Sequence, residues 1–164
     1  MTLRRARAQD APRLAALARW VWLDSYATDG VEPRFLPYLD ESFSPAAFER
    51  AVADPRQALW LQEEGAALQG FAQALRGAPA PVPSDAQVEL TRLYVAPPCT
   101  GRGLGARLLH AARETWPGEG LWLSVWVGNE GALRFYAREG GRHAGQTQFM
   151  LDGQAIANEV IAFP

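Results

Sequence analysis

The sequence predicts an α/β domain built on a mixed sheet of about seven strands, flanked by four helices. Two observations support this fold class. Apolar residues recur at helical spacing within residues 10–54 and then change to the alternating spacing of strands within residues 58–75. Residues 88–139 follow the order strand, helix, strand, helix, which makes their two strands parallel. A chain of 164 residues has the size of one domain, and we expect residues 1–164 to form a single one.

The periodic segments of the chain give the order β-α-α-β-β-β-α-β-α-β-β. They are a strand over 2–7, helices over 10–26 and 44–54, strands over 58–61, 68–75 and 88–95, a helix over 101–116, a strand over 121–127, a helix over 129–139, and strands over 141–151 and 155–163.

Capping residues mark where the first two helices begin. Asp10 can accept hydrogen bonds from the first amides of a helix, and Pro12 suits the first turn of that helix. Ser44 and Pro45 give the same signal for the second helix. The aromatic segment over 35–43 has no regular period, so we expect an irregular connection there.

Turn residues separate the later elements. Residues 63–65 carry a hairpin turn signal between two strands. Residues 77–84 contain three prolines and form a loop that is too short to divide the chain into two domains. Asp152 and Gly153 mark the turn of a closing hairpin. Exposed termini and this hairpin leave open that the protein pairs with a second copy as a homodimer.

Composition excludes several classes of protein. A net charge of −2 argues against a nucleic-acid binder, which normally carries a basic surplus. No apolar run is long enough to span a bilayer, so we expect no membrane partner. Residues 1–10 are charged where a secretory signal would be apolar, which favours a cytoplasmic protein. One cysteine and two histidines predict no disulfide and no metal site.

The most informative segment is a loop between a strand and a helix that carries Gly101, Gly103 and Gly105. The first amides of a helix lack intrahelical partners and carry partial positive charge. Glycines allow an anion to approach these amides closely because they have no side chain. The loop therefore predicts a phosphate site.

The loop sequence over 101–106 also fits the dinucleotide pattern G-x-G-x-x-G/A, so the motif alone does not identify the ligand. A dinucleotide fold places this loop directly after its first strand and has an acidic residue roughly 20 positions later. Here the loop lies late in the chain and five residues separate it from the preceding strand. A P-loop is excluded, because the chain contains no lysine. A glycine-rich turn without a ligand is the remaining alternative.

Two blocks carry a resemblance to a known family. They read L-Y-V-A-P-P-C-T-G-R-G-L-G-A-R-L-L and L-S-V-W-V-G-N-E-G-A-L-R-F-Y-A-R-E-G. Together with the order of elements, they resemble the GNAT superfamily of N-acetyltransferases over essentially the whole chain. Gly103 and Gly105 match the family pattern R/Q-x-x-G-x-G/A, and Arg102 takes a commonly basic position. Thr100 stands where arginine or glutamine is usual, and Gly141 stands where an aromatic residue is usual.

The resemblance implies that acetyl-CoA is the acyl donor and that no metal takes part. Loop amides would hold the pyrophosphate, the strand over 93–95 would bond the pantetheine arm through its backbone, and the strand over 121–127 would splay away to leave a slot. The implied cofactor-binding residues are Leu93, Tyr94, Val95, Thr100, Gly101, Arg102, Gly103, Leu104, Gly105, Ala106 and Asn129. An N-cap for the following helix is the alternative role of Asn129.

The resemblance also implies two catalytic residues. An alkyl ammonium has a pKa of about 10.4, so an attacking amine needs a base or a water chain to remove its proton. Glu89 aligns with the glutamate that serves as base in several members, and strand alternation would place it on the face of Thr91 and Leu93. Tyr136 aligns with the tyrosine that protonates the departing thiolate. A solvated glutamate and a packed aromatic beside Phe135 are the alternative interpretations.

The acceptor side is the most individual part of the sequence. Residues 20–43 combine six aromatic residues with five carboxylates and one arginine, a combination that suits a cationic amine. Our hypothesis is that Trp22, Tyr26 and Asp24 line the acceptor pocket, although core aromatics and a solvated acidic face would give the same pattern. The acceptor is a small amine or a peptide. A non-catalytic acyl-CoA sensor and a transferase of longer acyl groups stay open.

Overall fold

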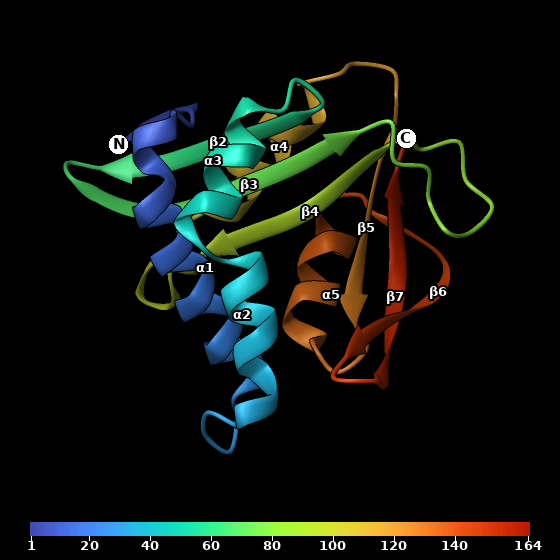
Figure 1. The fold of residues 1–164 in the computed structure, drawn as a ribbon. Coiled ribbons are helices and arrows are strands. Elements are labelled where there is room, and N and C mark those ends of the chain that lie inside the picture. The colour runs from blue at the N-terminus through green and yellow to red at the C-terminus, as the bar shows by residue number, and fades with distance from the viewer.

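The computed structural model describes residues 1–164, and its seven strands form one mixed sheet (Figure 1). The strands are β1 (Thr2–Arg5), β2 (Gln57–Glu64), β3 (Ala67–Arg76), β4 (Val88–Val95), β5 (Leu121–Trp126), β6 (Arg142–Leu151) and β7 (Gln154–Phe163). Their order in the sheet is β1-β2-β3-β4-β5-β7-β6. The strands β4 and β5 are parallel, and every other neighbouring pair is antiparallel. The predicted fold class, a mixed sheet of seven strands flanked by helices, is confirmed.

Helices cover both faces of the sheet. They are α1 (Ala11–Tyr26), α2 (Leu36–Ser42), α3 (Pro45–Ala53), α4 (Leu104–Arg113) and α5 (Glu130–Arg138), with 3₁₀ turns at Ala8–Asp10, Pro33–Phe35 and Pro97–Cys99. In Figure 1, α1 and α3 lie in front of the strands β2 to β4, α2 extends below the end of β4, and α4 lies behind the strands. None of these helices combines the length and apolar character that crossing a bilayer requires.

The main differences from the predicted elements concern α2 and α4, and the structure has five α-helices where four were expected. Helix α2 lies within residues 35–43, where an irregular segment was expected, because a helix of seven residues is too short to show a period and is stabilised by packing of its buried Leu39. Helix α4 begins at Leu104 and not at residue 101, because Gly101 and Gly103 have φ angles of +74° and +77°, outside the helical region. It ends at Arg113 and not at residue 116, ahead of a proline at 117.

The core consists of two main apolar clusters, one on each face of the sheet. One cluster joins α1, α2 and α3 to β2 and β3, and its largest buried side chains include Phe35, Phe43, Phe48 and Phe71. The other joins α4 and α5 to β4, β5 and β7 through residues such as Leu108, Leu109, Leu123 and Phe163. Burying one such side chain stabilises the fold by about 1.5–3 kcal/mol. The clusters fix how the helices sit on the sheet.

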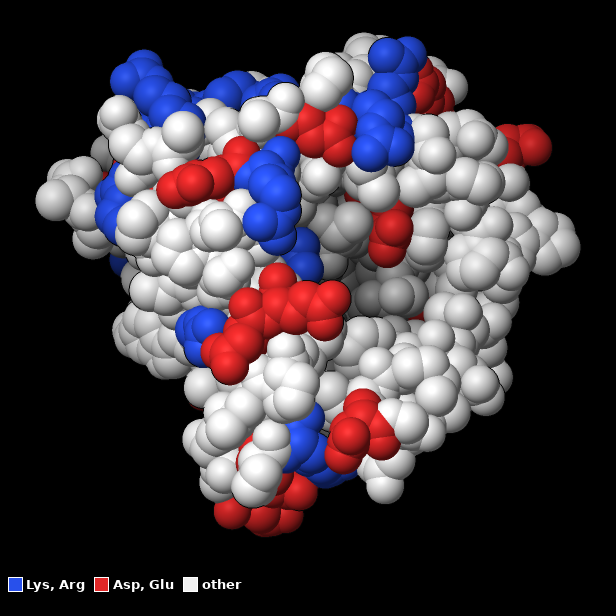
Figure 2. Space-filling view, in the orientation of Figure 1, with Lys and Arg blue, Asp and Glu red and all other residues white.

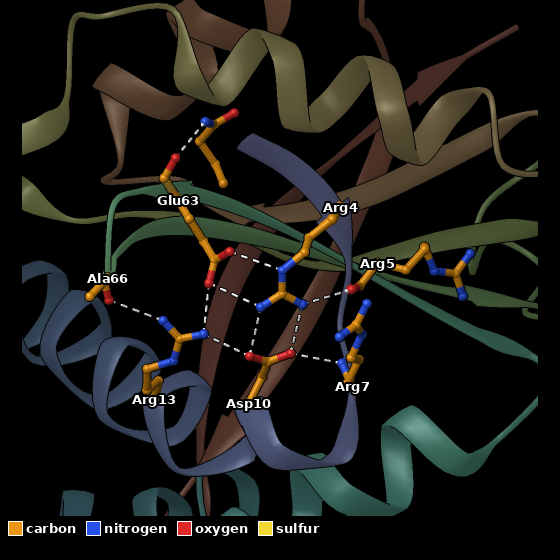
Figure 3. A network of polar contacts seen from close by, with 8 residues as sticks. Arg4, Arg5, Arg7, Asp10, Arg13, Glu63 and Ala66 are labelled. Carbon is orange, nitrogen blue, oxygen red and sulfur yellow. Dashed lines mark hydrogen bonds and ion pairs between the residues drawn. The ribbon is translucent and has the colours of Figure 1, made fainter. Parts of the chain in front are cut away.

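A network of ion pairs anchors the start of α1 to β1 and β2 (Figure 3). Asp10 is 1% exposed and accepts two hydrogen bonds of 2.9 Å from the Arg4 guanidinium. Glu63 also accepts from Arg4, and Arg13 donates to both carboxylates at 2.7 Å. Asp10 stands at the N-cap position as predicted, but its side chain bonds these arginines and the Arg7 amide in place of the helix amides. Its hydrogen bonds to Arg4 hold the pKa of Asp10 well below its ordinary value.

Candidate active site

The parallel strands β4 and β5 diverge soon after they begin. Their pairing is limited to Val88 with Leu121 and Glu89 with Trp122, after which the strands separate (Figure 1). The edge of β4 that would face β5 is therefore left without a strand partner over most of its length. An extended ligand can bond such an edge as an added strand. The splay that the family resemblance implied is present.

The first cavity lies between the free part of β4, the glycine loop and α5, and we call it the glycine-loop cavity. It has a volume of about 590 Å³. Nine of its lining residues were predicted to bind the cofactor: Leu93, Val95, Thr100, Gly101, Gly103, Leu104, Gly105, Ala106 and Asn129. Most of the predicted cofactor site therefore gathers around one cavity.

The amides of this loop are free to bind an anion. From Gly101 to Ala106, no amide donates to a backbone or side-chain acceptor of the chain, and the series of helical bonds starts with Arg107 N to Gly103 O at 3.2 Å. Gly103 occupies the N-cap position of α4 in the left-handed region. Gly105 lies close to α5, because a Cβ atom there would come within 3.3 Å of the Phe135 ring. Unpaired amides at a helix N-terminus can bind a phosphate, and we call this stretch the phosphate cradle.

Three residues predicted to contact the cofactor direct their side chains to other partners. Thr100 Oγ1 donates to Pro97 O at 3.0 Å, so its hydroxyl stabilises the turn before the loop. Arg102 does not line the cavity and instead forms an ion pair of 3.2 Å with Glu64 on the β2–β3 hairpin. Tyr94 turns its ring to the opposite face of the sheet, where it packs against aromatic residues of the α1 side. Only the backbone of Tyr94 is available along the open edge of β4.

Helix α5 brings Asn129 and Tyr136 to the opening between the strands. Asn129 Oδ1 accepts a hydrogen bond of 3.1 Å from Ala132 N, so Asn129 is the N-cap of α5 and its amide nitrogen is free for another partner. Tyr136 is 8% exposed, and burial raises its pKa above the ordinary value, which keeps its hydroxyl protonated. Both residues line the glycine-loop cavity and also the cavity on its other side.

This second cavity, which we call the aromatic cavity, has a volume of about 440 Å³. Trp22 and Tyr26 of α1 stack with ring centroids 4.6 Å apart, and Tyr26 lies 5.7 Å from Trp126 of β5. Tyr38 of α2 and Phe149 of β6 complete the wall, with centroids 5.4 Å apart. Figure 2 shows the molecule hollowed between α2 and the strands β5 to β7, with acidic side chains at the border of the hollow.

Glu89 lines the aromatic cavity at the closed end of the splay. Burial raises the pKa of its carboxyl, and the positive charge of Arg92 opposes part of that rise. The prediction that Glu89 shares a face of the sheet with Leu93 is wrong. The pairing of β3 with β4 shifts register between Gln73 and Ala74 and leaves Thr91 unpaired as a bulge, which reverses the alternation of side chains along β4. Leu93 therefore packs in the same apolar cluster as the two residues that flank Glu89, whereas the Glu89 side chain points to the other face of the sheet.

The predicted acceptor residues divide between the two cavities. Trp22 and Tyr26 line the aromatic cavity, but Asp24 lies in the wall of the glycine-loop cavity, because α1 crosses the opening and presents different faces to each side. Ser124 on β5 and Asn158 on β7 also line the aromatic cavity, and sequence reasoning missed both. A lone serine within the apolar strand L-W-L-S-V-W was the available signal for Ser124.

The other reactive side chains do not form a second centre. Cys99 lines the glycine-loop cavity and is a free thiol, and His110 is exposed on α4 as expected. His143, which carried no prediction, pairs with Glu159 on the β6–β7 hairpin. No group of three or more His, Cys, Asp or Glu side chains is placed to hold a metal ion.

The chain has relatives among known proteins. The model of the acetyltransferase (GNAT) family matches residues 14–141. An uncharacterised N-acetyltransferase of Mycobacterium bovis is 31% identical over 145 residues, which cover 87% of this chain and 89% of that protein. The N-alpha-acetyltransferase RimI of Mycobacterium tuberculosis is 31% identical over 106 residues, which cover 65% of each protein.

Solved structures share the fold. The PaiA N-acetyltransferase of Thermoplasma acidophilum, in complex with coenzyme A, superposes with a TM-score of 0.72 at 21% identity over 96% of both chains. NAA60 of Arabidopsis thaliana, in complex with acetyl-CoA, gives a TM-score of 0.73 at 17% identity over 99% of this chain and 97% of that one. From the family match and the N-acetyltransferase relatives, the chain belongs to the GNAT family and is an N-acetyltransferase, an enzyme that transfers an acetyl group to an amine.

Proposed function

We propose that the protein transfers the acetyl group of acetyl-CoA to a primary amine by direct attack, with Glu89 as base and Tyr136 as acid. The observation that supports this most strongly is the meeting of two cavities at the end of the free β4 edge. Both cavities share the residues Val21, Ser25, Leu93, Asn129, Ala132 and Tyr136. A donor in one cavity and an acceptor in the other would come together at this junction.

The donor would occupy the glycine-loop cavity. Its pyrophosphate would accept hydrogen bonds from the free amides of residues 101–106, and its pantetheine arm would follow the open backbone edge of Leu93 to Val95. The free amide nitrogen of Asn129 is available to bond the arm. Two of the similar structures contain coenzyme A or acetyl-CoA, which supports the same ligand for this chain.

The amine would enter through the aromatic cavity. The rings of Trp22, Tyr26 and Trp126 suit a cationic acceptor, because an ammonium group is attracted to aromatic faces. Glu89 would take the proton of the ammonium through a water molecule, and its raised pKa brings its basicity closer to that task. The neutral nitrogen then attacks the acetyl carbonyl carbon.

The leaving group needs a proton. As the new C–N bond forms and the C–S bond breaks, the Tyr136 hydroxyl would donate its proton to the departing thiolate of coenzyme A. The hydroxyl is protonated near neutral pH because burial raises its pKa. The ammonium nitrogen loses two protons, one to Glu89 before the attack and one to water as the C–N bond forms, and sulfur gains one proton from Tyr136. Solvent then takes the proton from Glu89 and returns one to Tyr136, so each turnover releases one proton overall.

The test is a steady-state assay with acetyl-CoA and a panel of primary amines. We expect Glu89→Gln and Tyr136→Phe each to lower kcat about 100-fold at pH 7 while acetyl-CoA still binds. The wild-type rate should fall at acid pH as Glu89 is protonated, and Glu89→Gln should lose this acid limb. Glu130→Gln, an exposed change at the start of α5 that lines neither cavity, is the control. Full activity of both catalytic variants would refute these roles, and an enzyme that uses no amine would refute the proposed function.

A further inference from the structure

Asn158 carries an amide oxygen without a partner in the wall of the aromatic cavity. The residue lies on β7, is 7% exposed, and its Oδ1 accepts no hydrogen bond. Its Nδ2 donates only a long hydrogen bond of 3.4 Å to Ser124 Oγ, and Ser124 lines the same cavity. An unpaired buried amide oxygen is unfavourable, so a donor from a ligand would stabilise it.

Two other buried amide oxygens lack partners, but they have a different setting. Gln62 on β2 and Gln69 on β3 line neither the aromatic cavity nor the glycine-loop cavity. Asn158 is therefore the unpaired buried amide that borders the space proposed for the acceptor. Rotation about its Cβ–Cγ bond is sufficient to turn the oxygen or the nitrogen toward a ligand.

The strand register separates Asn158 from the proposed base. Asn158 pairs with Trp126 on β5, whereas Glu89 pairs with Trp122 at the closed end of the splay. Four residues along a strand correspond to on the order of 13 Å. An acceptor whose reacting nitrogen lies near Glu89 would therefore meet Asn158 with another part of the molecule. The aromatic rings of Trp22, Tyr26 and Trp126 line the same cavity as Glu89 and Asn158.

We propose that Asn158 accepts a hydrogen bond from a second nitrogen, so that the preferred acceptors are diamines and longer polyamines. This inference rests on the proposed function and names the substrate class of the same site. An ammonium group supplies the N–H donor that the amide oxygen lacks, and the aromatic walls favour a positive charge. Asn158 is then a specificity-determining residue that contacts the unreactive end of the acceptor.

The test compares hexane-1,6-diamine with hexylamine, which differ only in the second nitrogen. Initial rates with acetyl-CoA are measured for the full chain and for Asn158→Leu, which keeps a similar volume and removes the amide. We expect the variant to lose about 10- to 100-fold in kcat/KM for the diamine, mainly through KM, and to change little for hexylamine. The KM for acetyl-CoA should stay the same, because Asn158 does not line the glycine-loop cavity.

Gln148→Leu is the matched control, because it makes the same chemical change at an exposed position of β6 outside both cavities. It should leave the preference for the diamine unchanged. Thermal unfolding distinguishes a structural role, since replacing an unpaired buried amide by leucine should not lower Tm. An equal loss for both amines, an unchanged preference, or a dependence on Asn158 seen only with a tetrapeptide amide would overturn the proposal.

A binding measurement separates this inference from the proposed function. In the presence of coenzyme A, hexane-1,6-diamine should raise the Tm of the wild type more than hexylamine does, and Asn158→Leu should lose that difference. If the wild type acetylates no amine, the proposed function fails, yet this difference would still support the contact. Equal Tm shifts with the two amines would overturn the role of Asn158 whatever the activity.

Discussion

The two cavities at the splayed strands are built in different ways. The glycine-loop cavity offers backbone amides from one short stretch of chain, residues 101–106, whereas the aromatic cavity is formed by side chains from α1, α2, α5 and four strands. A backbone site recognises a chemical group that all members of a family can share, such as a pyrophosphate. A site made of dispersed side chains can change one residue at a time, so under our proposal the aromatic cavity sets acceptor choice.

The largest expected effect concerns the ion-pair network that anchors the start of α1 to the sheet. Asp10→Asn should lower the free energy of unfolding by about 3 kcal/mol at pH 7, because it leaves the guanidinium groups of Arg4 and Arg13 without their buried partner. Urea unfolding measures the loss. The KM values for both substrates should stay unchanged below the unfolding transition, which would show that the ion pairs of Asp10 stabilise the fold without taking part in binding.

The ion pairs of Asp10 also predict how stability depends on pH. The folded-state pKa of Asp10 is lowered, so its contribution is present above the unfolded value of about 4 and is lost as pH falls toward the folded value. The difference between wild type and Asp10→Asn should therefore shrink on acidification below about pH 4. Asp40→Asn, which removes an exposed ion pair with Arg19, should cost less than about 1 kcal/mol. Equal losses for the two variants would contradict the importance of the buried network.

Gly103→Val tests the glycine-loop cavity, whose binding groups are backbone amides. Valine at a φ of +77° is strained, and relieving that strain would turn the loop amides away from the cavity. We expect the KM for acetyl-CoA to rise about 30-fold, with the acceptor KM nearly unchanged. Gly153→Val makes the same change at a φ of +73° in the β6–β7 turn and should leave the acetyl-CoA KM unaltered. A normal acetyl-CoA KM in Gly103→Val would contradict the phosphate cradle.

Tyr26→Leu tests the aromatic cavity, whose walls are side chains. Removing the ring that lies between Trp22 and Trp126 should raise the KM for a cationic acceptor about tenfold, because a cation–π contact contributes roughly 0.5–2 kcal/mol. The KM for acetyl-CoA should not change. Tyr26→Phe keeps the ring and should behave like the wild type. If Tyr26→Leu affected both substrates equally, the two cavities would not be separable.

The contrast also explains what the sequence could predict. The glycine loop and the cap of α5 at Asn129 were visible because the residues of each are adjacent in the chain. The face of Glu89 could not be predicted, since a one-residue bulge at Thr91 reverses strand alternation and leaves no mark in the sequence. The places of Asp24 and Asn158 depend on how α1 packs over the opening and on the register of β7 along β5, and tertiary packing decides both.

The smallest expected effect concerns Arg102, which lies next to the cradle but is held by Glu64. Gln69 donates to the same Glu64 carboxylate at 2.7 Å and helps to hold it beside Arg102. Because the carboxylate already binds the arginine, it would compete with an incoming phosphate for Arg102. Glu64→Gln should free Arg102 and lower the KM for acetyl-CoA two- to threefold at low salt, since exposed ion pairs contribute about 0.2–1 kcal/mol. Glu119→Gln, which releases Arg76 far from the loop, should have no such effect. If Glu64→Gln instead raised the KM, Glu64 would hold Arg102 in its binding position, and the cradle would depend on a side chain as well as on its amides.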